Sequence, residues 1–300
     1  MADIARSVLQ RLKNKAQSSG RSSQLLLQLF CQEEFLRRVQ KSRFHKNLVL
    51  KGGWLLYSLS GFETRPTMDV DFMLRNLSNQ VDEVENMVEE ILAINTGNDY
   101  VSFERKGAEL IAEHRQYSGV RVRLIGLIKN TRTPFEVDFG VGDVVVPSPA
   151  ERKLPALLEG FDEPVVMTYS LESIIAEKWD AILARLELSS RMKDFYDIYY
   201  LAGTYRFEAR KLQEAIMETL QNRGTIYDRH SLEKIFEFIN NKDFMVKWRN
   251  FCKKTMGLEI DAAEVLRVIV EFIGVPFGAI ILEKEIFEIW NPETMSYEKE

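Results

Sequence analysis

The sequence predicts an α+β domain over residues 1–165, followed by a helical domain over residues 166–300. Two observations carry this prediction. Apolar and polar side chains alternate over residues 68–74 and 135–140, as in half-buried strands. From residue 171 onward, apolar side chains recur at helical spacing instead. Segregation of strands from helices along a chain is typical of an α+β architecture.

Composition indicates a folded globular protein. The 300 residues are 45% hydrophobic and 28% charged, which excludes a disordered chain. No apolar run reaches the roughly 18 to 20 residues of a membrane span, and Arg6 and Arg11 interrupt the apolar core that a signal peptide needs. Cys31 and Cys252 form no disulfide framework, and the three histidines match no zinc spacing. We therefore expect a reduced, cytoplasmic protein without a membrane partner.

Charge is distributed unevenly along the chain. Residues 1–51 hold 11 lysines and arginines against three acids, although the net charge of the whole chain is −5. A basic end on an acidic body can steer a polyanion to one face. The alternative is a solvated helical surface that docks on the protein's own acids.

The first half is predicted to alternate between helices and strands. Helical spacing indicates helices over residues 3–16 and 23–41, which are separated at Gly20. The elements expected next are a strand at 47–51, a helix at 54–59, a strand at 68–74, a helix at 79–94, and strands at 101–106, 109–116, 120–128 and 135–140. A turn over residues 129–134 makes the last two strands a hairpin.

The second half is predicted to be helical throughout. Ser170 and Asp261 are the expected N-caps of its first and last helices, with Glu264 placed three residues after Asp261. The expected helices are 171–188, 193–201, 209–221, 231–240, 243–255 and 262–273.

The pair Asp69 and Asp71 is the most informative feature of the first half. Strand side chains alternate, so both carboxylates point to one face while Val70 and Phe72 point to the other. Adjacent carboxylates repel unless a cation neutralises them, and Mg²⁺ takes carboxylate and phosphate oxygens. The alternative is an exposed edge with two solvated acids.

Gly52 and Gly53 lie between a predicted strand and a predicted helix. Glycines there let a phosphate approach the backbone, and a helix N-terminus offers unpaired N–H groups. Arg65 and Thr67 precede the aspartates, where they can contact a phosphate. A tight strand-to-helix turn and a surface arginine are the plainer interpretations.

Glu136 and Asp138 share one face of a second apolar strand. If that strand lies beside the first, three carboxylates converge as in sites where two metals clamp a phosphoryl-type displacement. The third carboxylate can also accept the proton of the attacking hydroxyl. Alternatively, Glu136 pairs with Arg121 or Arg123 across the hairpin.

The helical half has a polar cluster of its own. Lys178 and Arg185 are seven residues apart and share a helix face. A lysine on an apolar face either extends its ammonium to water or binds phosphate. Asp194 and Asp197 are helical neighbours, and either could pair with Lys178 or Arg185. A purely structural ion-pair network is the alternative.

Taken in order, these motifs resemble the nucleotidyl transferase AbiEii toxin family, whose relatives include the MenT toxins. The likeness covers nearly the whole chain. It consists of Lys51-Gly52-Gly53, Arg65-x-Thr67-x-Asp69-x-Asp71, Glu136-x-Asp138, Ala176-Glu177-Lys178 and Lys193-Asp194-Phe195-Tyr196-Asp197, with Glu33-Glu34-Phe35-Leu36 near the start and Trp248-Arg249-x-Phe251 in the tail.

The resemblance implies a polymerase-β-like nucleotidyltransferase domain, with a mixed sheet flanked by helices, and a helical C-terminal domain. It implies that Gly52 and Gly53 bind the triphosphate and that Lys178 holds phosphates. It further implies that one acid of the helical domain, Asp197 or Asp194, supports the site. It also implies that Asp69, Asp71 and Asp138 ligate Mg²⁺ or Mn²⁺.

The function that the resemblance implies is that of a toxin in a toxin–antitoxin pair, with a cognate antitoxin as partner. Such an enzyme transfers a nucleoside monophosphate from an NTP to an RNA hydroxyl, which we expect to be the tRNA 3′ acceptor end. The basic residues 1–51 are then candidates for RNA contact. Two other functions are nucleotide transfer onto a protein side chain and catalytically silent NTP or RNA binding. Trp54 after Gly53, and Lys193 where the family has arginine, depart from the family pattern.

Overall fold

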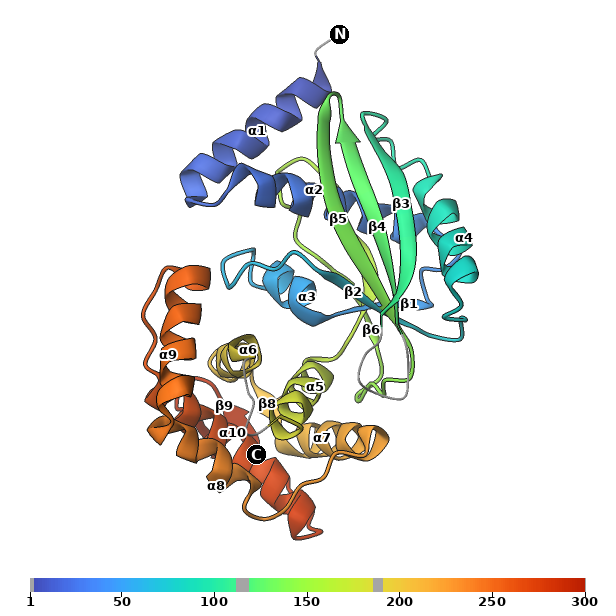
Figure 1. Cartoon of the computed structure of the whole chain (residues 1–300). Coiled ribbons are helices and arrows are strands. Elements are labelled where there is room, and N and C mark those ends of the chain that lie inside the picture. The colour runs from blue at the N-terminus through green and yellow to red at the C-terminus, as the bar shows by residue number, and fades with distance from the viewer. Residues whose placement is uncertain (1–2, 112–118, 186–190, 300) are drawn as a thin grey trace. The chain divides into compact units, whose positions relative to one another are not determined.

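The chain forms two compact units. Figure 1 shows the computed structural model, which describes residues 3–111, 119–185 and 191–299. The first unit holds residues 1–142 and 150–168, and the second holds residues 143–149 and 169–300. None of the described helices combines the length and the apolar character needed to cross a lipid bilayer.

The described part of the first unit contains a mixed seven-stranded sheet of order β3-β4-β5-β2-β1-β7-β6. Its strands are β1 (Leu48–Lys51), β2 (Val70–Leu74), β3 (Val101–Ile111), β4 (Gly119–Ile128), β5 (Thr131–Gly140), β6 (Ala150–Lys153) and β7 (Val165–Thr168). Strand β2 pairs antiparallel with β1 and parallel with β5. The strand that carries Asp71 is therefore inside the sheet rather than at its edge.

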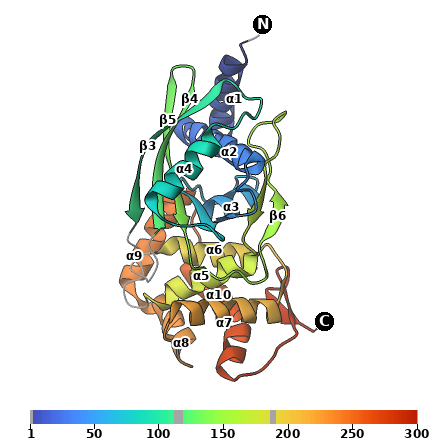
Figure 2. The ribbon, with the colours of Figure 1, turned by 90° about the vertical axis from the view of Figure 1, so that its right-hand side faces the viewer.

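Helices line one face of this sheet. They are α1 (Ile4–Ser19), α2 (Ser23–Lys41), α3 (Gly52–Leu59) and α4 (Val81–Leu92). Helix α2 contacts β5 and β7, and α4 contacts β3 and β4 (Figures 1 and 2). The core beneath α2 is aromatic. Phe35 meets Phe72 edge-on, and Phe72 stacks on Phe139 with the ring centroids 5.8 Å apart. Burial of these rings fixes which face of β2 and β5 is left for polar side chains.

The hairpin of β4 and β5 is tighter than the sequence predicts. Strand β5 begins at Thr131 instead of residue 135, so the expected six-residue turn shrinks to Lys129 and Asn130. Pro134 is tolerated within the strand because it lies where β5 pairs with β4 alone, opposite Ile125. Residues 101–111 form one strand with a bulge between Arg105 and Gly107, where two strands are predicted. The rest of the predicted strand 109–116 lies outside the described residues.

The second unit is mainly helical. Its elements are α5 (Leu171–Leu183), α6 (Met192–Ala202), β8 (Phe207–Glu208), α7 (Ala209–Arg223), α8 (Ser231–Phe236), the 3-10 helix η1 (Glu237–Asn240), α9 (Lys242–Phe251), the π-helical η2 (Cys252–Met256), α10 (Ala262–Ile281), β9 (Ile289–Asn291) and β10 (Ser296–Glu298). The predicted caps are confirmed, since Ser170 accepts a hydrogen bond from Ser173 N and Asp261 accepts one from Ala263 N. Residues 186–188 of the first predicted helix lie outside the described part.

Helix α10 continues beyond its predicted end at residue 273. Pro276 lies inside the helix, where it removes the N–H that would bond the carbonyl four residues earlier. That carbonyl belongs to Phe272, and it accepts a 2.7 Å hydrogen bond from the Tyr297 hydroxyl of β10 instead. The C-terminal strand therefore satisfies the group that the proline leaves unpaired, and the helix runs on to Ile281.

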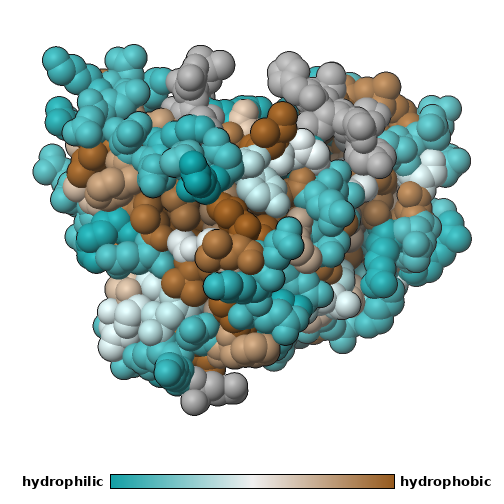
Figure 3. All heavy atoms as spheres, turned by 90° about the horizontal axis from the view of Figure 1, so that it is seen from below, coloured by the Kyte–Doolittle hydropathy of each residue, from teal (hydrophilic) through white to brown (hydrophobic). Residues whose placement is uncertain are grey.

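Apolar side chains also reach the surface. Ile226, Leu282 and Phe287 are large exposed apolar residues of the second unit. On the face drawn in Figure 3, apolar side chains gather near the middle of the view, with hydrophilic ones around them.

The α+β prediction is confirmed, and the strands that the sequence does not predict are short: β6 to β10 have two to four residues each.

Candidate functional site

Strand register places the predicted carboxylates of the sheet in one row. Asp71 of β2 is the register partner of Asp138 on β5 and of Lys51 on β1. Asp138 is in turn opposite Arg121 on β4. Because side chains alternate along each strand, Asp69 lies two residues before Asp71 toward the same face. Asp69 is exposed and precedes the first residue of β2.

Hydrophobic burial dictates which way these acids point. Val70 and Phe72 of β2, and Val137 and Phe139 of β5, are each at most 1% exposed. Their side chains fill the face beneath α2, so the intervening acids are left on the opposite face. The prediction that the aspartates share one face follows from this alternation alone.

The two glycines lie directly against the predicted site residues. Gly52 has φ +70°, and a Cβ built on it would be 2.3 Å from Oδ2 of Asp71. A Cβ on Gly53 would be 3.0 Å from Oγ1 of Thr67 and 3.2 Å from Nη2 of Arg65. The first turn of α3, the carboxylate of Asp71 and the segment before β2 therefore meet at one place, with no space for a side chain at position 52.

Trp54 points away from this place. Its ring is fully buried, and its Nε1 donates a 3.0 Å hydrogen bond to Oε1 of Gln32 on α2. Gln32 Nε2 donates in turn to the carbonyl of Met68 at 2.7 Å, and Gln28 Nε2 donates to the same carbonyl at 2.8 Å. The bulky residue that departs from the family pattern thus serves the core, and α2 fastens both α3 and the residue before Asp69.

Asp138 is held by an arginine. Arg121 donates to its Oδ1 from Nε at 2.8 Å and to its Oδ2 from Nη2 at 2.7 Å. The third nitrogen, Nη1, lies 3.2 Å from Oε2 of Glu136, and Arg123 Nε lies 3.7 Å from Glu136 Oε1. The alternative that pairs Glu136 with Arg121 or Arg123 across the hairpin is therefore confirmed. The hydrogen bond to Asp138 raises the pKa of Arg121, and the nearby charges of Glu136 and Asp69 add to this effect.

The predicted polar cluster of the second unit also forms. Lys178 Nζ on α5 lies 2.5 Å from Oδ2 of Asp197 and 3.4 Å from Oδ1 of Asp194, both on α6. The three side chains are 10%, 3% and 5% exposed. Lys178, rather than the exposed Arg185, takes both acids. Arg191 contacts the second oxygen of Asp194 at 3.1 Å.

A second arginine fixes the helix that carries Lys178. Arg223 of α7 contacts Asp143 at 2.7 Å, and Glu177 and Asp180 of α5 at 2.9 and 3.0 Å. The surrounding carboxylates raise the pKa of Arg223 against the opposing effect of its burial. Residues on either side of Lys178 are therefore clamped to α7, which holds the lysine in a set orientation.

Comparison with protein families shows which family the chain belongs to. The family model for the nucleotidyl transferase AbiEii toxin of type IV toxin–antitoxin systems matches residues 34–269. The chain belongs to the nucleotidyl transferase AbiEii toxin family. The match includes every predicted site residue, and it identifies the protein as a nucleotidyltransferase whose family works as toxins beside an antitoxin. No curated protein matches the chain significantly.

The chain is similar to solved structures at low sequence identity. MenT4, a nucleotidyltransferase toxin from Mycobacterium tuberculosis, is 15% identical with a TM-score of 0.56, covering 90% of this chain and 98% of MenT4. JHP933 from Helicobacter pylori is 15% identical with a TM-score of 0.47, covering 87% of this chain and 94% of the other. The likeness to MenT4 confirms the predicted nucleotidyltransferase fold.

The carboxylates of this AbiEii family member meet the needs of a divalent cation in part. Asp69 and Asp71 supply the carboxylate oxygens that Mg²⁺ prefers beside substrate phosphates. Asp138 differs, because Arg121 engages both of its oxygens. Within the described ranges, no three His, Cys, Asp or Glu side chains gather in a group that could hold a metal ion. The role of Asp138 as a third ligand stays a prediction.

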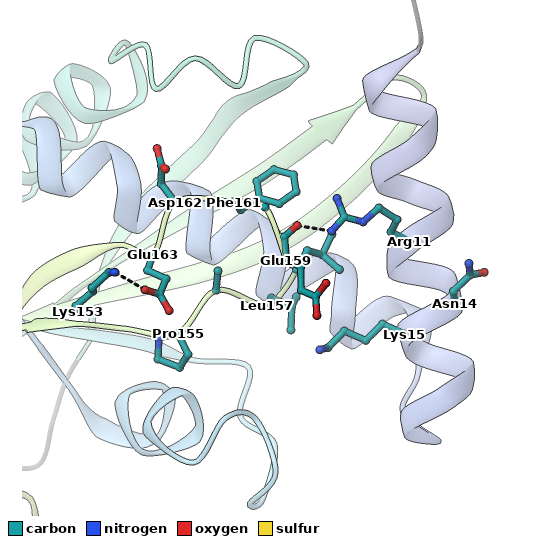
Figure 4. Close-up of a pocket in the computed structure, with 13 residues that line it drawn as sticks. Arg11, Asn14, Lys15, Lys153, Pro155, Leu157, Glu159, Phe161, Asp162 and Glu163 are labelled. Atoms are coloured by element: carbon teal, nitrogen blue, oxygen red, sulfur yellow. Dashed lines mark hydrogen bonds and ion pairs between the residues drawn. The ribbon is translucent and has the colours of Figure 1, made fainter.

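The basic N-terminal residues are mostly engaged within the first unit. Arg37 is buried and pairs with Glu33 and Glu34, while Arg43 pairs with Glu90. Figure 4 shows Arg11 bonded to the carbonyl of Glu159 in a cavity of about 700 Å³ between α1 and residues 155–163. None of the predicted site residues lines this cavity. Much of the positive charge of residues 1–51 therefore pairs with the protein's own acids or donates hydrogen bonds to its carbonyls.

Sequence reasoning assigned no site role to Gln28, Gln32 and Arg121. Gln28 and Gln32 are four residues apart in an apolar helix, and both are buried. Two amides at that spacing on a buried face are a readable signal of a shared acceptor. The pairing of Arg121 with Asp138 depends on hairpin register, which became known only from the fold.

Proposed function

We propose that this nucleotidyltransferase transfers a nucleoside monophosphate from an NTP to an RNA hydroxyl, at the 3′ acceptor end of tRNA, with release of pyrophosphate. The observation that carries the proposal is the meeting of Gly52 and Gly53 with Asp71, Thr67 and Arg65 at the start of α3. Backbone N–H groups at a helix N-terminus favour phosphate, and the glycines leave the backbone open to approach.

In this assignment the triphosphate lies against the first turn of α3. Arg65 and Thr67 contact its phosphates. Phosphate binding by Lys178, with Asp197 and Asp194 as its partners, is a separate part of the proposal. A lysine held between two acids has a set direction, which suits it to one phosphate contact. Electrostatic stabilisation and positioning account for most of phosphoryl-transfer catalysis.

Asp69, Asp71 and Asp138 are the residues that would hold Mg²⁺, for which Mn²⁺ could substitute. A cation bound there would neutralise negative charge on the phosphates during the transfer. The acceptor hydroxyl oxygen bonds to the α-phosphorus as the bond to the bridging oxygen breaks. Pyrophosphate leaves with that electron pair, and the hydroxyl proton passes to a carboxylate, which we assign to Asp138.

The test uses purified protein with total tRNA, Mg²⁺ and each α-labelled NTP in turn. We expect label to enter tRNA from one NTP and to be absent with Asp69→Ala. The matched control is Asp99→Ala, which removes one carboxylate from the loop before β3 in the same unit. Label in a protein band would show that the acceptor is a protein rather than tRNA. NTP that stays intact would refute the proposal that this site catalyses nucleotide transfer.

A further inference from the structure

The charges on the polar face of β2, β5 and β4 are arranged around one arginine. Arg121 is 32% exposed and Asp138 is 20% exposed, so both side chains can reach water. Arg121 uses Nε and Nη2 for Asp138 and the separate Nη1 for Glu136. Asp69 is close enough to act on Arg121 through its charge. Glu109 is opposite Arg121 on β3, but its carboxylate pairs with Arg123.

We propose that Arg121 is the positioning residue of the carboxylate site: it occupies Asp138 as an internal counter-cation and releases it only when a divalent cation arrives with NTP. The proposal rests on the proposed function, because it assumes that Asp138 serves as a ligand there. It adds a device that governs when the cation binds.

The geometry explains how release can occur without unfolding the sheet. Backbone pairing of β4 with β5 holds both residues in register, with Val120 and Val122 buried on either side of Arg121. Only the arginine side chain must move. Two hydrogen bonds to Asp138 break, while the contact of Nη1 with Glu136 gives the guanidinium a carboxylate that it already touches. Its charge therefore stays paired after the move.

Competition between the two cations sets the order of binding. The bidentate guanidinium of Arg121 occupies both oxygens of Asp138, so a metal ion needs an oxygen that Arg121 already holds. A metal ion beside Arg121 is also repelled by its charge. The phosphates of an NTP add negative charge that attracts both the metal ion and the Arg121 guanidinium. The triphosphate therefore favours metal binding and gives Arg121 another anion to pair with. We expect weak cation binding without NTP and tight binding with it.

The experiment measures Mn²⁺ bound to the full chain by electron paramagnetic resonance, without NTP and with a non-hydrolysable NTP analogue. Arg121→Gln should bind Mn²⁺ up to about fivefold more tightly than wild type without NTP, since a partly exposed ion pair is worth up to about 1 kcal/mol. Arg123→Gln is the matched control, because it removes the same charge from the same face of β4 but has no contact with Asp138. It should bind Mn²⁺ as wild type does.

A second pair of variants keeps the test decisive. Adding Asp138→Asn to Arg121→Gln should return Mn²⁺ affinity to the wild-type value. If Arg121→Gln does not fold, Arg121→Lys keeps the charge but loses the two-pronged contact, and it should tighten Mn²⁺ binding by a smaller factor.

The outcomes separate this inference from the proposed function. Mn²⁺ that binds wild type in an Asp69-dependent manner, with no gain in Arg121→Gln, overturns the inference and leaves the proposed function standing. Equal gains in Arg121→Gln and Arg123→Gln also overturn it, because the effect is then one of general charge. No Mn²⁺ binding by any variant with the NTP analogue overturns both.

Discussion

Replacing Gly52 with alanine separates two consequences of one methyl group. The first is backbone strain, because Gly52 has φ +70°. An L-residue in this left-handed region costs about 1–2 kcal/mol of unfolding free energy. The second is displacement of a site residue, because the new Cβ would lie 2.3 Å from Oδ2 of Asp71, whereas ordinary contact begins at 3.4 Å.

The displacement term decides the effect on activity. Restoring ordinary contact moves the Asp71 carboxylate or the first turn of α3 by about 1 Å, a shift that can cost on the order of 100-fold in rate. We therefore expect Gly52→Ala to lose about 1–2 kcal/mol of stability and nearly all nucleotide transfer. Chemical denaturation measures the first quantity, and incorporation of α-labelled NTP into tRNA measures the second.

Gly61 provides the matched control. It follows α3 in the same unit with φ +66°, and a Cβ built on it meets nothing within 4 Å. Gly61→Ala should lose a similar amount of stability by strain and keep its transfer rate. If Gly52→Ala transfers label as fast as Gly61→Ala, the contact between Gly52 and Asp71 has no part in the reaction and the reasoning is refuted.

Three further changes probe the buried polar groups. Lys178→Met leaves Asp197 buried without its lysine and should cost about 3 kcal/mol of unfolding free energy, as well as NTP use, as shown by denaturation and NTP titration. Gln32→Leu removes one of the two donors to the Met68 carbonyl and leaves the Trp54 indole N–H without its acceptor, so it should lower stability by about 1–3 kcal/mol and slow transfer. Burial raises the pKa of the Cys31 thiol from 9.0 to about 12. Unfolded chains then ionise this thiol first, so unfolding free energy falls as pH rises from 9 toward 12, which denaturation at stepped pH measures.

Each of these has a result that contradicts it. Asp197→Asn added to Lys178→Met should recover part of the stability but none of the NTP use; full recovery of both would remove Lys178 from the site. A Gln32→Leu enzyme that is less stable but equally fast would make Gln32 purely structural. A Cys31→Ala variant with the same alkaline slope as wild type would assign that slope to other groups.

Local patterns were sufficient wherever a side chain's environment depends on its sequence neighbours. Alternation of Val70 and Phe72 with the aspartates predicted the shared face, and the helical run from residue 171 predicted α5 with Ser170 as its cap. Strands β6 and β7 escaped prediction, although the equally short β1 was expected. Their conformation depends on pairing with each other and with β1.

Helix α10 shows the same division of information. Its sequence predicts an end before Pro276, because proline removes a backbone donor. The helix continues because Tyr297, more than twenty residues away, donates to the carbonyl left unpaired. No window around the proline contains that hydroxyl.

The sequence by itself determined which residues are the candidates for the chemistry, since family motifs and side-chain periodicity are local properties. They are the paired glycines, the Asp-x-Asp motif, and the lysine and acids of the helical half. The tertiary structure alone decided their partners. Register across β4 and β5 gave Asp138 to Arg121, packing beneath α2 turned Trp54 to Gln32, and the approach of α6 to α5 gave Lys178 to Asp197 and Asp194. Such pairings depend on distances between segments remote in the chain, which burial and backbone pairing set only when the whole fold forms.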